Sequence, residues 1–163
     1  MSLLSLDAAR RLFDSNLLGP ESLASFLGGT VPAGELRIDT AVAEQAHREG
    51  CLLLYRPARF PDGAPVTLAN LFERAVALAQ PGSGFRGEDP WFLRDPVSRS
   101  ESVETGWALV SREPWPETRN QTYEGANREI TRRAAGRPWR RRRGGEAAFD
   151  TLAFCHVHGV RLL

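Results

Sequence analysis

The fold is decided by the stretch Asp39-Thr-Ala-Val-Ala-Glu-Gln-Ala-His-Arg-Glu-Gly-Cys-Leu-Leu-Leu-Tyr55. Its last five residues form an unbroken apolar run, which is typical of a strand buried on both faces. The residues before that run predict a short helix, with Asp39 and Thr40 at its start and Gly50 at its end. Upstream, Glu35-Leu-Arg-Ile-Asp39 alternates polar and apolar residues, as a half-buried strand does. Strand, helix and strand in succession indicate a right-handed βαβ crossover.

The rest of the chain alternates short helical segments with two more strand-like segments. Apolar residues at helical spacing follow Ser5, Pro20 and Thr67, each a favourable first residue of a helix. Further helices are expected over residues 123–134 and 147–149, and strands over 106–112 and 154–163. This order predicts an α+β fold in which short helices pack on a small mixed sheet; the alternative is an α/β fold with one βαβ unit.

The 163 residues, 42% apolar and 25% charged, are expected to form a single globular domain. Residues 81–105 are rich in glycine, proline, serine and charge, which predicts a long irregular loop. The longest apolar run, residues 51–55, is far too short to cross a bilayer, and the start of the chain lacks the basic and apolar regions of a secretory signal. We therefore expect a cytoplasmic protein with no membrane contact.

The chain's positive charge is unevenly distributed. All 21 basic side chains are arginines, and eight of them lie between residues 128 and 143 with one glutamate, so this segment carries +7. The other 147 residues carry 13 arginines and 19 acids, a net charge of −6. Codon bias explains the absence of lysine but not the clustering. A guanidinium can bind two phosphate or carboxylate oxygens at once, so the segment is a candidate contact for a polyanion or for acidic neighbours.

The candidate polyanion-binding residues are the later arginines of this segment and the tryptophan among them: Arg132, Arg133, Arg137, Trp139, Arg140, Arg141, Arg142 and Arg143. Trp139 is expected to make a stacking or cation–π contact with an arginine or a ligand. The partner would be an acidic protein surface or nucleic-acid phosphates, and a nucleic-acid contact would tolerate any sequence. About four phosphate contacts predict a log–log slope of affinity against salt of roughly −3 to −4.

A weaker pattern indicates a metal site. In His156-Val157-His158, alternate residues of a strand would aim two imidazoles at one ion, so His156 and His158 are candidate metal ligands. The third ligand is left open among His47, Glu146 and Asp150. The alternative is that both histidines are hydrogen-bonded to backbone or carboxylate groups without a metal.

Two other patterns carry no chemistry. The glycines of residues 82–87 have the spacing of a dinucleotide-binding loop, but a helix precedes them and a proline-containing coil follows, so no cofactor is expected. Cys51 and Cys155 lie in apolar segments and are expected to be free thiols that pack as small apolar side chains.

Three function hypotheses follow. The leading one is a non-enzymatic interaction module that contacts an acidic protein or a nucleic-acid backbone through its arginine-rich segment. The alternatives are a metal-assisted hydrolase centred on His156 and His158, and a structural subunit whose oppositely charged faces dock in an oligomer. Under the leading hypothesis, serine at positions 140–143 weakens binding and barely changes thermal stability.

Overall fold

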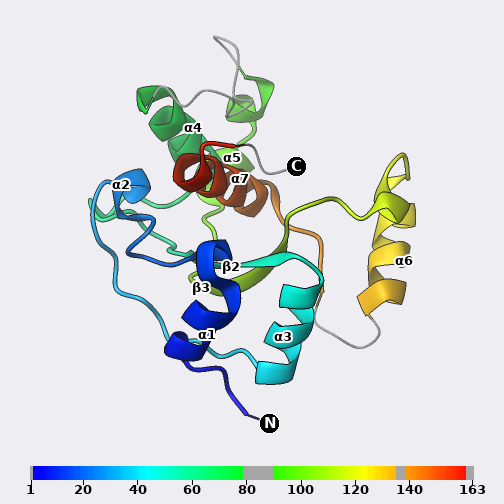
Figure 1. Cartoon of the computed structure of the whole chain (residues 1–163). Coiled ribbons are helices and arrows are strands. Elements are labelled where there is room, and N and C mark those ends of the chain that lie inside the picture. Colours follow the sequence, from blue (N-terminus) through cyan, green and yellow to red (C-terminus); the bar gives the residue numbers. More distant parts are fainter. Residues whose placement is uncertain (1, 79–89, 135–138, 161–163) are drawn as a thin grey trace.

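The computed structural model describes residues 2–78, 90–134 and 139–160, and within these ranges it has an α+β fold (Figure 1). In chain order the elements are α1 (Leu6–Phe13), η1 (Asp14–Asn16), β1 (Leu17–Leu18), α2 (Ala24–Leu27), α3 (Thr40–Arg48), β2 (Cys51–Arg56), α4 (Leu68–Ala77), η2 (Trp91–Arg94), α5 (Val97–Ser100), β3 (Gly106–Ser111), η3 (Pro116–Thr118), α6 (Tyr123–Ala134) and α7 (Gly144–His158). None of the helices in the described ranges combines the length and the apolar character that a bilayer crossing requires.

The described strands form one sheet in the order β1-β2-β3, so β2 is central. β1 runs parallel to β2, with Leu17 opposite Leu53, and β3 runs antiparallel to β2, with Ser111 opposite Cys51. Every residue of β2 is buried, as its apolar run predicts. The expectation of short helices on a small mixed sheet is confirmed.

The predicted βαβ crossover is wrong in its first strand. Residues 35–38 lie outside every strand, and the parallel neighbour of β2 is β1, whose two residues are too few to show an alternating pattern. The segment before α3 is held by side chains of the sheet. The Tyr55 hydroxyl donates to the Pro32 carbonyl at 3.0 Å, and the Trp107 indole donates to the Gly34 carbonyl at 2.9 Å. These bonds satisfy carbonyls that a sheet ladder would otherwise pair.

The helix starts read from the sequence are confirmed for α1, α3 and α4. Ser5, Asp39 and Thr67 each accept a hydrogen bond from the backbone amide two or three residues later. Asp39 rather than Thr40 is the capping residue of α3. The strand expected over 106–112 and the helix over 123–134 are present as β3 and α6.

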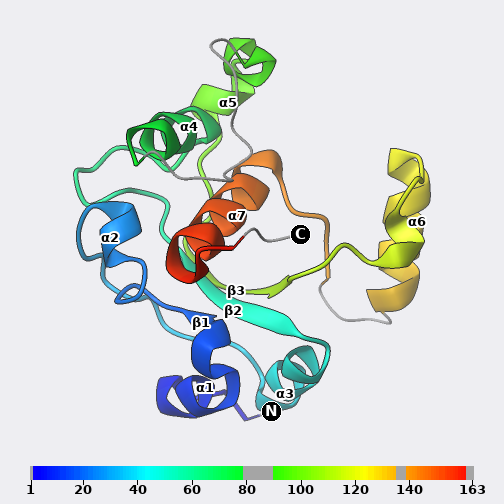
Figure 2. The same cartoon turned by 45° about the horizontal axis from the view of Figure 1, so that its top comes forward.

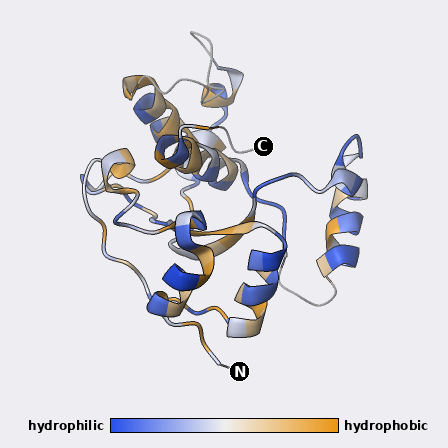
Figure 3. Cartoon of the chain, in the orientation of Figure 1, coloured by the Kyte–Doolittle hydropathy of each residue, from blue (hydrophilic) through white to orange (hydrophobic). Residues whose placement is uncertain are grey.

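Helices cover both faces of the sheet, and two apolar clusters result. One cluster joins β2 and β3 to α2, α4 and α7, with Phe26, Phe149 and Leu152 fully buried. The other joins the opposite face to α1 and α3 through Phe13 and Leu53. Figure 2 shows α7 on one side of β2 and β3, and α1 and α3 on the other. Figure 3 shows that the strands are mainly apolar, whereas α6 is mainly hydrophilic.

The C-terminal prediction is wrong, because α7 is one helix from Gly144 to His158 where a short helix and a strand over 154–163 were expected. Its buried residues lie on several faces, from Phe149 to Cys155, so the helix is enclosed by the core and shows no clear amphipathic period. A buried helix and a buried strand are hard to distinguish by periodicity alone. Gly159 ends the helix in the left-handed conformation, with φ 68°.

The long irregular loop predicted over 81–105 is partly structured. Residues 90–105 contain η2 and α5, and Thr67 and Ser102 form an isolated bridge. Residues 81–89, with the glycine pattern at 82–87, lie outside the described residues.

Cys51 and Cys155 are not joined in a disulfide and are buried, as expected for packing residues. Burial, reinforced by the charge of Glu49, raises the pKa of the Cys51 thiol to about 11. The reactive thiolate is therefore scarce at neutral pH.

Candidate functional site

The site begins where β2 ends, at a buried arginine that faces α7. Arg56 is 7% exposed, and it meets two carboxylates that lie one helical turn apart on α7, Glu146 and Asp150, which are 1% and 0% exposed. Its Nε and Nη2 donate to the two oxygens of Asp150 at 2.8 and 2.7 Å, and its Nη1 lies 3.4 Å from Glu146 Oε1. Buried charges are stable only when paired in this way.

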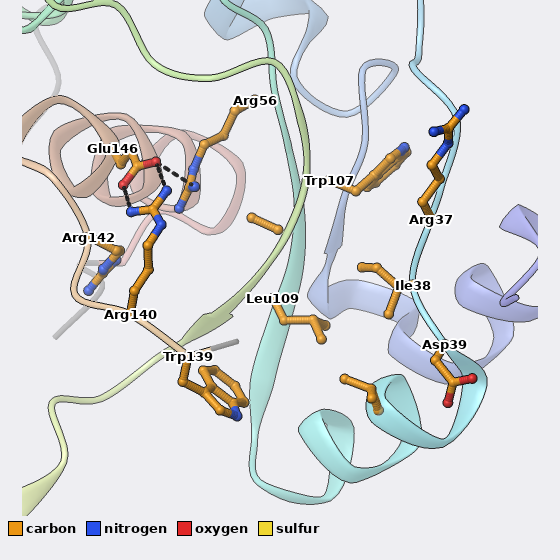
Figure 4. A pocket seen from close by; sticks show the side chains of 12 residues that line it. Arg37, Ile38, Asp39, Arg56, Trp107, Leu109, Trp139, Arg140, Arg142 and Glu146 are labelled. Atoms are coloured by element: carbon orange, nitrogen blue, oxygen red, sulfur yellow. Dashed lines mark hydrogen bonds and ion pairs between the residues drawn. The ribbon is translucent and has the colours of Figure 1, made fainter. Parts of the chain in front are cut away.

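The arginine-rich segment adds two more guanidiniums to this pair of acids. Arg140 binds both oxygens of Glu146, at 2.7 and 2.6 Å, and Arg142 donates to Asp150 Oδ2 at 3.3 Å (Figure 4 shows the contacts of Glu146 with Arg140 and Arg56). We call the five residues the buried ion cluster: Arg56, Arg140, Arg142, Glu146 and Asp150. Its three arginines face the two buried carboxylates, and a third acid, Glu104, lies 3.9 Å from Arg140, so the three positive charges are matched by three acids.

Glu146 is the electrostatic centre of the cluster. The hydrogen bonds from Arg140 hold the pKa of this carboxyl at about 2, well below its usual 4.5. The backbone amide of Arg143, which donates at 2.8 Å, and the charge of Arg56 lower the pKa further, and together these contacts outweigh the opposing effect of burial. Glu146 therefore stays ionised and unable to act as a general acid at neutral pH.

The other predicted polyanion-binding arginines are also engaged by their own chain. Arg143 donates to Glu101 at 3.1 Å and to Glu104 at 2.6 Å, and Arg133 donates to Glu117 at 3.2 Å. Arg132 donates to Glu129 at 3.0 Å, and Arg141 lies over the Tyr123 ring at 4.9 Å. Arg137 lies outside the described residues.

These contacts correct the charge picture drawn from the sequence. The acids that balance the arginine-rich segment are not spread over a distant anionic body, because they lie against the guanidiniums themselves. In the described part of the segment, Arg128 and Arg141 are the arginines without an acidic partner, and Arg141 lies over the Tyr123 ring. An extended polyanion would therefore have to compete with carboxylates that are already bound.

Trp139 occupies the position expected of it, beside the arginines. Its ring packs edge to face against Trp115 with 5.8 Å between ring centroids, and the guanidinium of Arg133 lies 4.3 Å from the Trp115 ring. The contact predicted for Trp139 was with an arginine or a ligand; here Trp139 contacts Trp115, and the arginine, Arg133, lies over Trp115.

A cavity of about 420 Å³ opens beside β3, and Trp139 forms part of its wall. We call it the β3 cavity. Its walls are mainly apolar and come from the segment before α3, from α3, from β3 and from residue 139: Ile38, Val42, Trp107, Ala108, Leu109 and Trp139. One end is formed by four members of the buried ion cluster, and Arg37 and Asp39 line the other side (Figure 4). An apolar cavity with a few charged groups at one end is the usual form of a ligand site.

The arginines of the cluster differ in how many of their donor groups make hydrogen bonds. Both terminal nitrogens of Arg140 donate to Glu146. Arg142, whose side chain is 32% exposed, has one contact, from Nη1 to Asp150. Its Nε and Nη2 make no hydrogen bond in the described part of the chain, so these two donors are available to an anion.

Sequence reasoning found Trp139, Arg140 and Arg142 but missed the β3 side of the site. Trp107 and Leu109 are two positions apart on β3, and this spacing places them on one face of the sheet. Arg56 was also missed as a site residue, although a charge that directly follows a buried apolar run is a usable signal of a buried ion pair.

The candidate metal ligands do not come together. His156 and His158 lie on α7, where residues two apart point about 200° from each other, so the geometric premise of the metal prediction fails. His156 Nε2 lies 2.8 Å from Ser25 Oγ, and His158 packs on Phe154 at 4.4 Å. Across the described ranges, no group of three or more histidine, cysteine or acidic side chains is placed to hold a metal ion.

The residues considered for a third metal ligand are used elsewhere. Glu146 and Asp150 are bound by arginines, and the His47 ring packs on Phe13 at 5.7 Å. Burial lowers the pKa of His158, with a smaller contribution from Arg112, and among the described residues its Nε2 has no hydrogen-bond partner. A ring that is packed on Phe154 in this way suits a packing role.

No family model matches the chain, and searches of curated proteins and of solved structures give no significant match. Function therefore has to be inferred from the chemistry of the site, since a fold class alone does not specify one. The site offers an apolar cavity, two aromatic walls and a cluster of paired charges at one end, in which Arg142 has two donors that make no hydrogen bond to a described residue.

Proposed function

We propose that the chain is a non-enzymatic binding module and that it holds an anionic group in the β3 cavity. The observation that carries the proposal is Arg142, which lies at the charged end of the cavity with two donor groups unused by the described residues. A guanidinium with adjacent free N–H groups binds a carboxylate or a phosphate at two points.

The pairing within the buried ion cluster limits the kind of anion that can bind. Arg56, Arg140 and Arg142 face Glu146, Asp150 and Glu104, so an anion has to use the donors that these acids leave open. The low dielectric around buried groups strengthens the attraction for a compact anion at this point. The partner envisaged from the sequence is thereby narrowed from a long polyanion to one anionic group, which a small molecule or an acidic partner could carry.

A binding role accounts for these residues better than catalysis does. Among the described side chains that line the cavity, Glu146 is fixed as a carboxylate, and Asp39 caps α3 with one of its oxygens. The arginines and tryptophans cannot act as general bases at neutral pH. These groups can hold and orient a ligand by charge and stacking.

Amide-detected NMR tests the proposal directly. Sodium acetate and inorganic phosphate are titrated into the native protein at constant ionic strength, with sodium chloride as the reference. We expect saturable shifts confined to the amides around Arg142 and Leu109, and we expect Arg142→Gln to abolish them. Arg128→Gln is the matched control, because Arg128 is an exposed arginine on α6, away from the cavity. Shifts no larger than those with chloride would refute the proposal.

A further inference from the structure

We propose that the outer edge of β3 docks an extended segment of a partner protein, which adds a strand to the sheet and places one acidic side chain beside Arg141 and Arg142. This inference rests on the proposed binding role of the β3 cavity and names the kind of partner. It depends on three observations: unpaired backbone groups on both walls of a groove, cavities on opposite faces of the sheet, and the charges that line the groove.

β3 is an edge strand of the described sheet, and its one partner there is β2. In an antiparallel pair, every second residue turns its N–H and C=O groups away from the neighbouring strand. Within the described residues, none of these outward groups of Gly106–Ser111 makes a hydrogen bond. The strand also contains no charged residue and no proline, which proteins commonly use to block an edge against further pairing. The edge is therefore open to another strand.

Residues 139–142 form the opposite wall of the groove. Three of them line the β3 cavity, and all four line a second cavity of about 330 Å³, which we call the α6 cavity; Leu109 of β3 lines both. The segment lies in no helix or strand, and the one hydrogen bond described for its backbone runs from the Arg140 side chain to the Arg141 carbonyl. A strand in the groove can therefore pair with both walls.

The surroundings of the groove favour a peptide segment over the edge of a second folded sheet. In Figures 1 and 2 the chain that leads into α7 passes between the sheet and α6. The α6 cavity is closed on its far side by Ala126 and Ile130 of α6 and by Trp115. A second copy of the chain would have to bring its own sheet past these residues, whereas a single extended segment does not.

The two cavities lie toward opposite faces of the sheet. Val42 of α3 lines the β3 cavity, and Trp107 and Leu109 pack with the apolar cluster of that face. The α6 cavity is lined by Ala147 of α7 and by Val110, which belongs to the cluster on the α7 face. Successive side chains of a strand point to opposite faces. A docked strand therefore directs alternate side chains to apolar walls of the two cavities, as in other complexes where a peptide extends a sheet.

The charges around the α6 cavity fit one acidic side chain. Arg141 lies over the Tyr123 ring and has no acidic partner among the described residues, and Arg142 has two donor groups that none of those residues uses. Glu113 also lines this cavity and makes no ion pair with a described residue, so a run of acids in the partner would be repelled. The partner segment is therefore mainly apolar, with a single acid.

The test uses a library of capped heptapeptides in which threonine alternates with valine, leucine, phenylalanine or tyrosine, with one glutamate at either end. Matched peptides carry glutamine in place of glutamate, or N-methyl groups on the backbone. Binding to the native protein is followed by amide hydrogen exchange and NMR. We expect glutamate peptides to protect every second amide of β3, since the amides that face β2 are already protected, and to protect amides of residues 139–142. N-methylated peptides keep every side chain but lack the donors, so they should not bind.

Matched variants test the cavity and the charge separately. Val42→Trp fills the β3 cavity from α3 and should weaken peptide binding by roughly tenfold, whereas Ala41→Trp, at an exposed position of the same helix, should leave it unchanged. Glutamate peptides should bind about two- to fivefold more tightly than glutamine peptides, the effect of one exposed ion pair. Arg141→Gln should remove that difference, and Arg128→Gln should keep it. The exchange pattern of β3 in the native protein decides the inference even if a variant fails to fold.

The outcomes distinguish this inference from the proposed function. If acetate and phosphate shift the amides around Arg142 but no peptide protects β3, the inference is wrong and anion binding stands. If peptides protect β3 while glutamate gives no advantage and no anion shifts those amides, strand docking stands and the proposed anion site is wrong. Protection of β3 that rises with protein concentration in the absence of peptide, together with a dimer in sedimentation, would assign the edge to a second copy and overturn the inference.

Discussion

Arg56 and Asp150, 94 positions apart in the sequence, form a two-point ion pair in the protein interior, with Nε–Oδ1 and Nη2–Oδ2 distances of 2.8 and 2.7 Å. The pair joins the last residue of β2 to the middle of α7 and is almost completely buried. Such a pair adds little net stability over apolar residues of the same size, but the loss of one partner leaves a buried charge uncompensated.

We therefore predict that Arg56→Met destabilises the fold strongly. Methionine replaces much of the arginine's volume but leaves Glu146 and Asp150 with two arginines at the surface-facing side of the cluster. The free energy of unfolding, measured with urea, should fall by about 3 kcal/mol. Arg48→Met, at an exposed arginine of α3, serves as the control and should change it by about 0.5 kcal/mol or less. Similar losses for the two variants would contradict a stabilising role for the buried pair.

Serine at positions 140–143 is predicted to lower thermal stability, which reverses the expectation drawn from the sequence. Three of these four arginines are paired with acids of the same chain, and two of the pairs involve the buried Glu146 and Asp150. The expected loss is about 3 kcal/mol, or roughly 6 to 12 °C in Tm, by calorimetry.

The control for this variant removes the same charge elsewhere, with serine at the exposed Arg11, Arg48, Arg119 and Arg128. We expect a clearly smaller loss from that variant, because these side chains make no ion pair with an acid in the described part of the chain. An unchanged Tm after substitution of residues 140–143 would instead support the original hypothesis of a free cationic surface.

The pH dependence of stability should report the ionisation of Glu146. Its pKa of about 2 in the folded protein lies below the usual 4.5, so the carboxylate form stabilises the folded state. That stabilisation is fully present above about pH 4.5 and is lost as the pH falls to about 2. Over this interval the free energy of unfolding should fall by about 3 kcal/mol. The measurement is urea unfolding of the native protein and of Glu146→Gln over this interval. The two unfolding free energies should converge as the pH falls, and a constant difference would contradict the prediction.

The sequence predicted those elements of the fold that are marked by features of a few neighbouring residues. The apolar run of β2 and the capping side chains Ser5 and Thr67 are local features, and the elements they mark are present. β1 was missed because two residues cannot show a period, and the end of α7 was misread because a helix surrounded by core is apolar on several faces. In both cases tertiary packing, which local pattern does not encode, decided the structure.

The sequence predicted the arginines of the candidate site but did not predict which acids they contact. The clustering of Arg140 and Arg142 is visible in the sequence, and so is the four-residue spacing of Glu146 and Asp150, which places two acids on one face of a helix. That spacing becomes informative only if residues 144–158 are read as helical. Arg56 lies about 90 positions away, and its approach to α7 depends on how β2 and α7 pack.

The last prediction concerns α6, which Figures 1 and 2 show apart from the sheet and the other helices. Within the described residues its buried side chains are small, Ala126 and Ala134, and its neighbour is the segment around η3. The described aromatic contacts that fasten this region to residues 139 and 141 are the Trp115–Trp139 pair, the Arg133 guanidinium over Trp115 and the Arg141 guanidinium over Tyr123. A short, mainly hydrophilic helix is unstable alone, so few contacts must hold it.

Trp139→Ala should therefore increase amide hydrogen exchange in α6 by roughly five- to thirtyfold, which corresponds to about 1 to 2 kcal/mol of local stability. Exchange in β2 should change little, because its protection comes from the two apolar clusters. Trp91→Ala is the control, since Trp91 is 77% exposed and packs on Phe92 in η2. If Trp139→Ala accelerates exchange in β2 as much as in α6, the two regions open together, and Trp139 supports the whole fold rather than one helix.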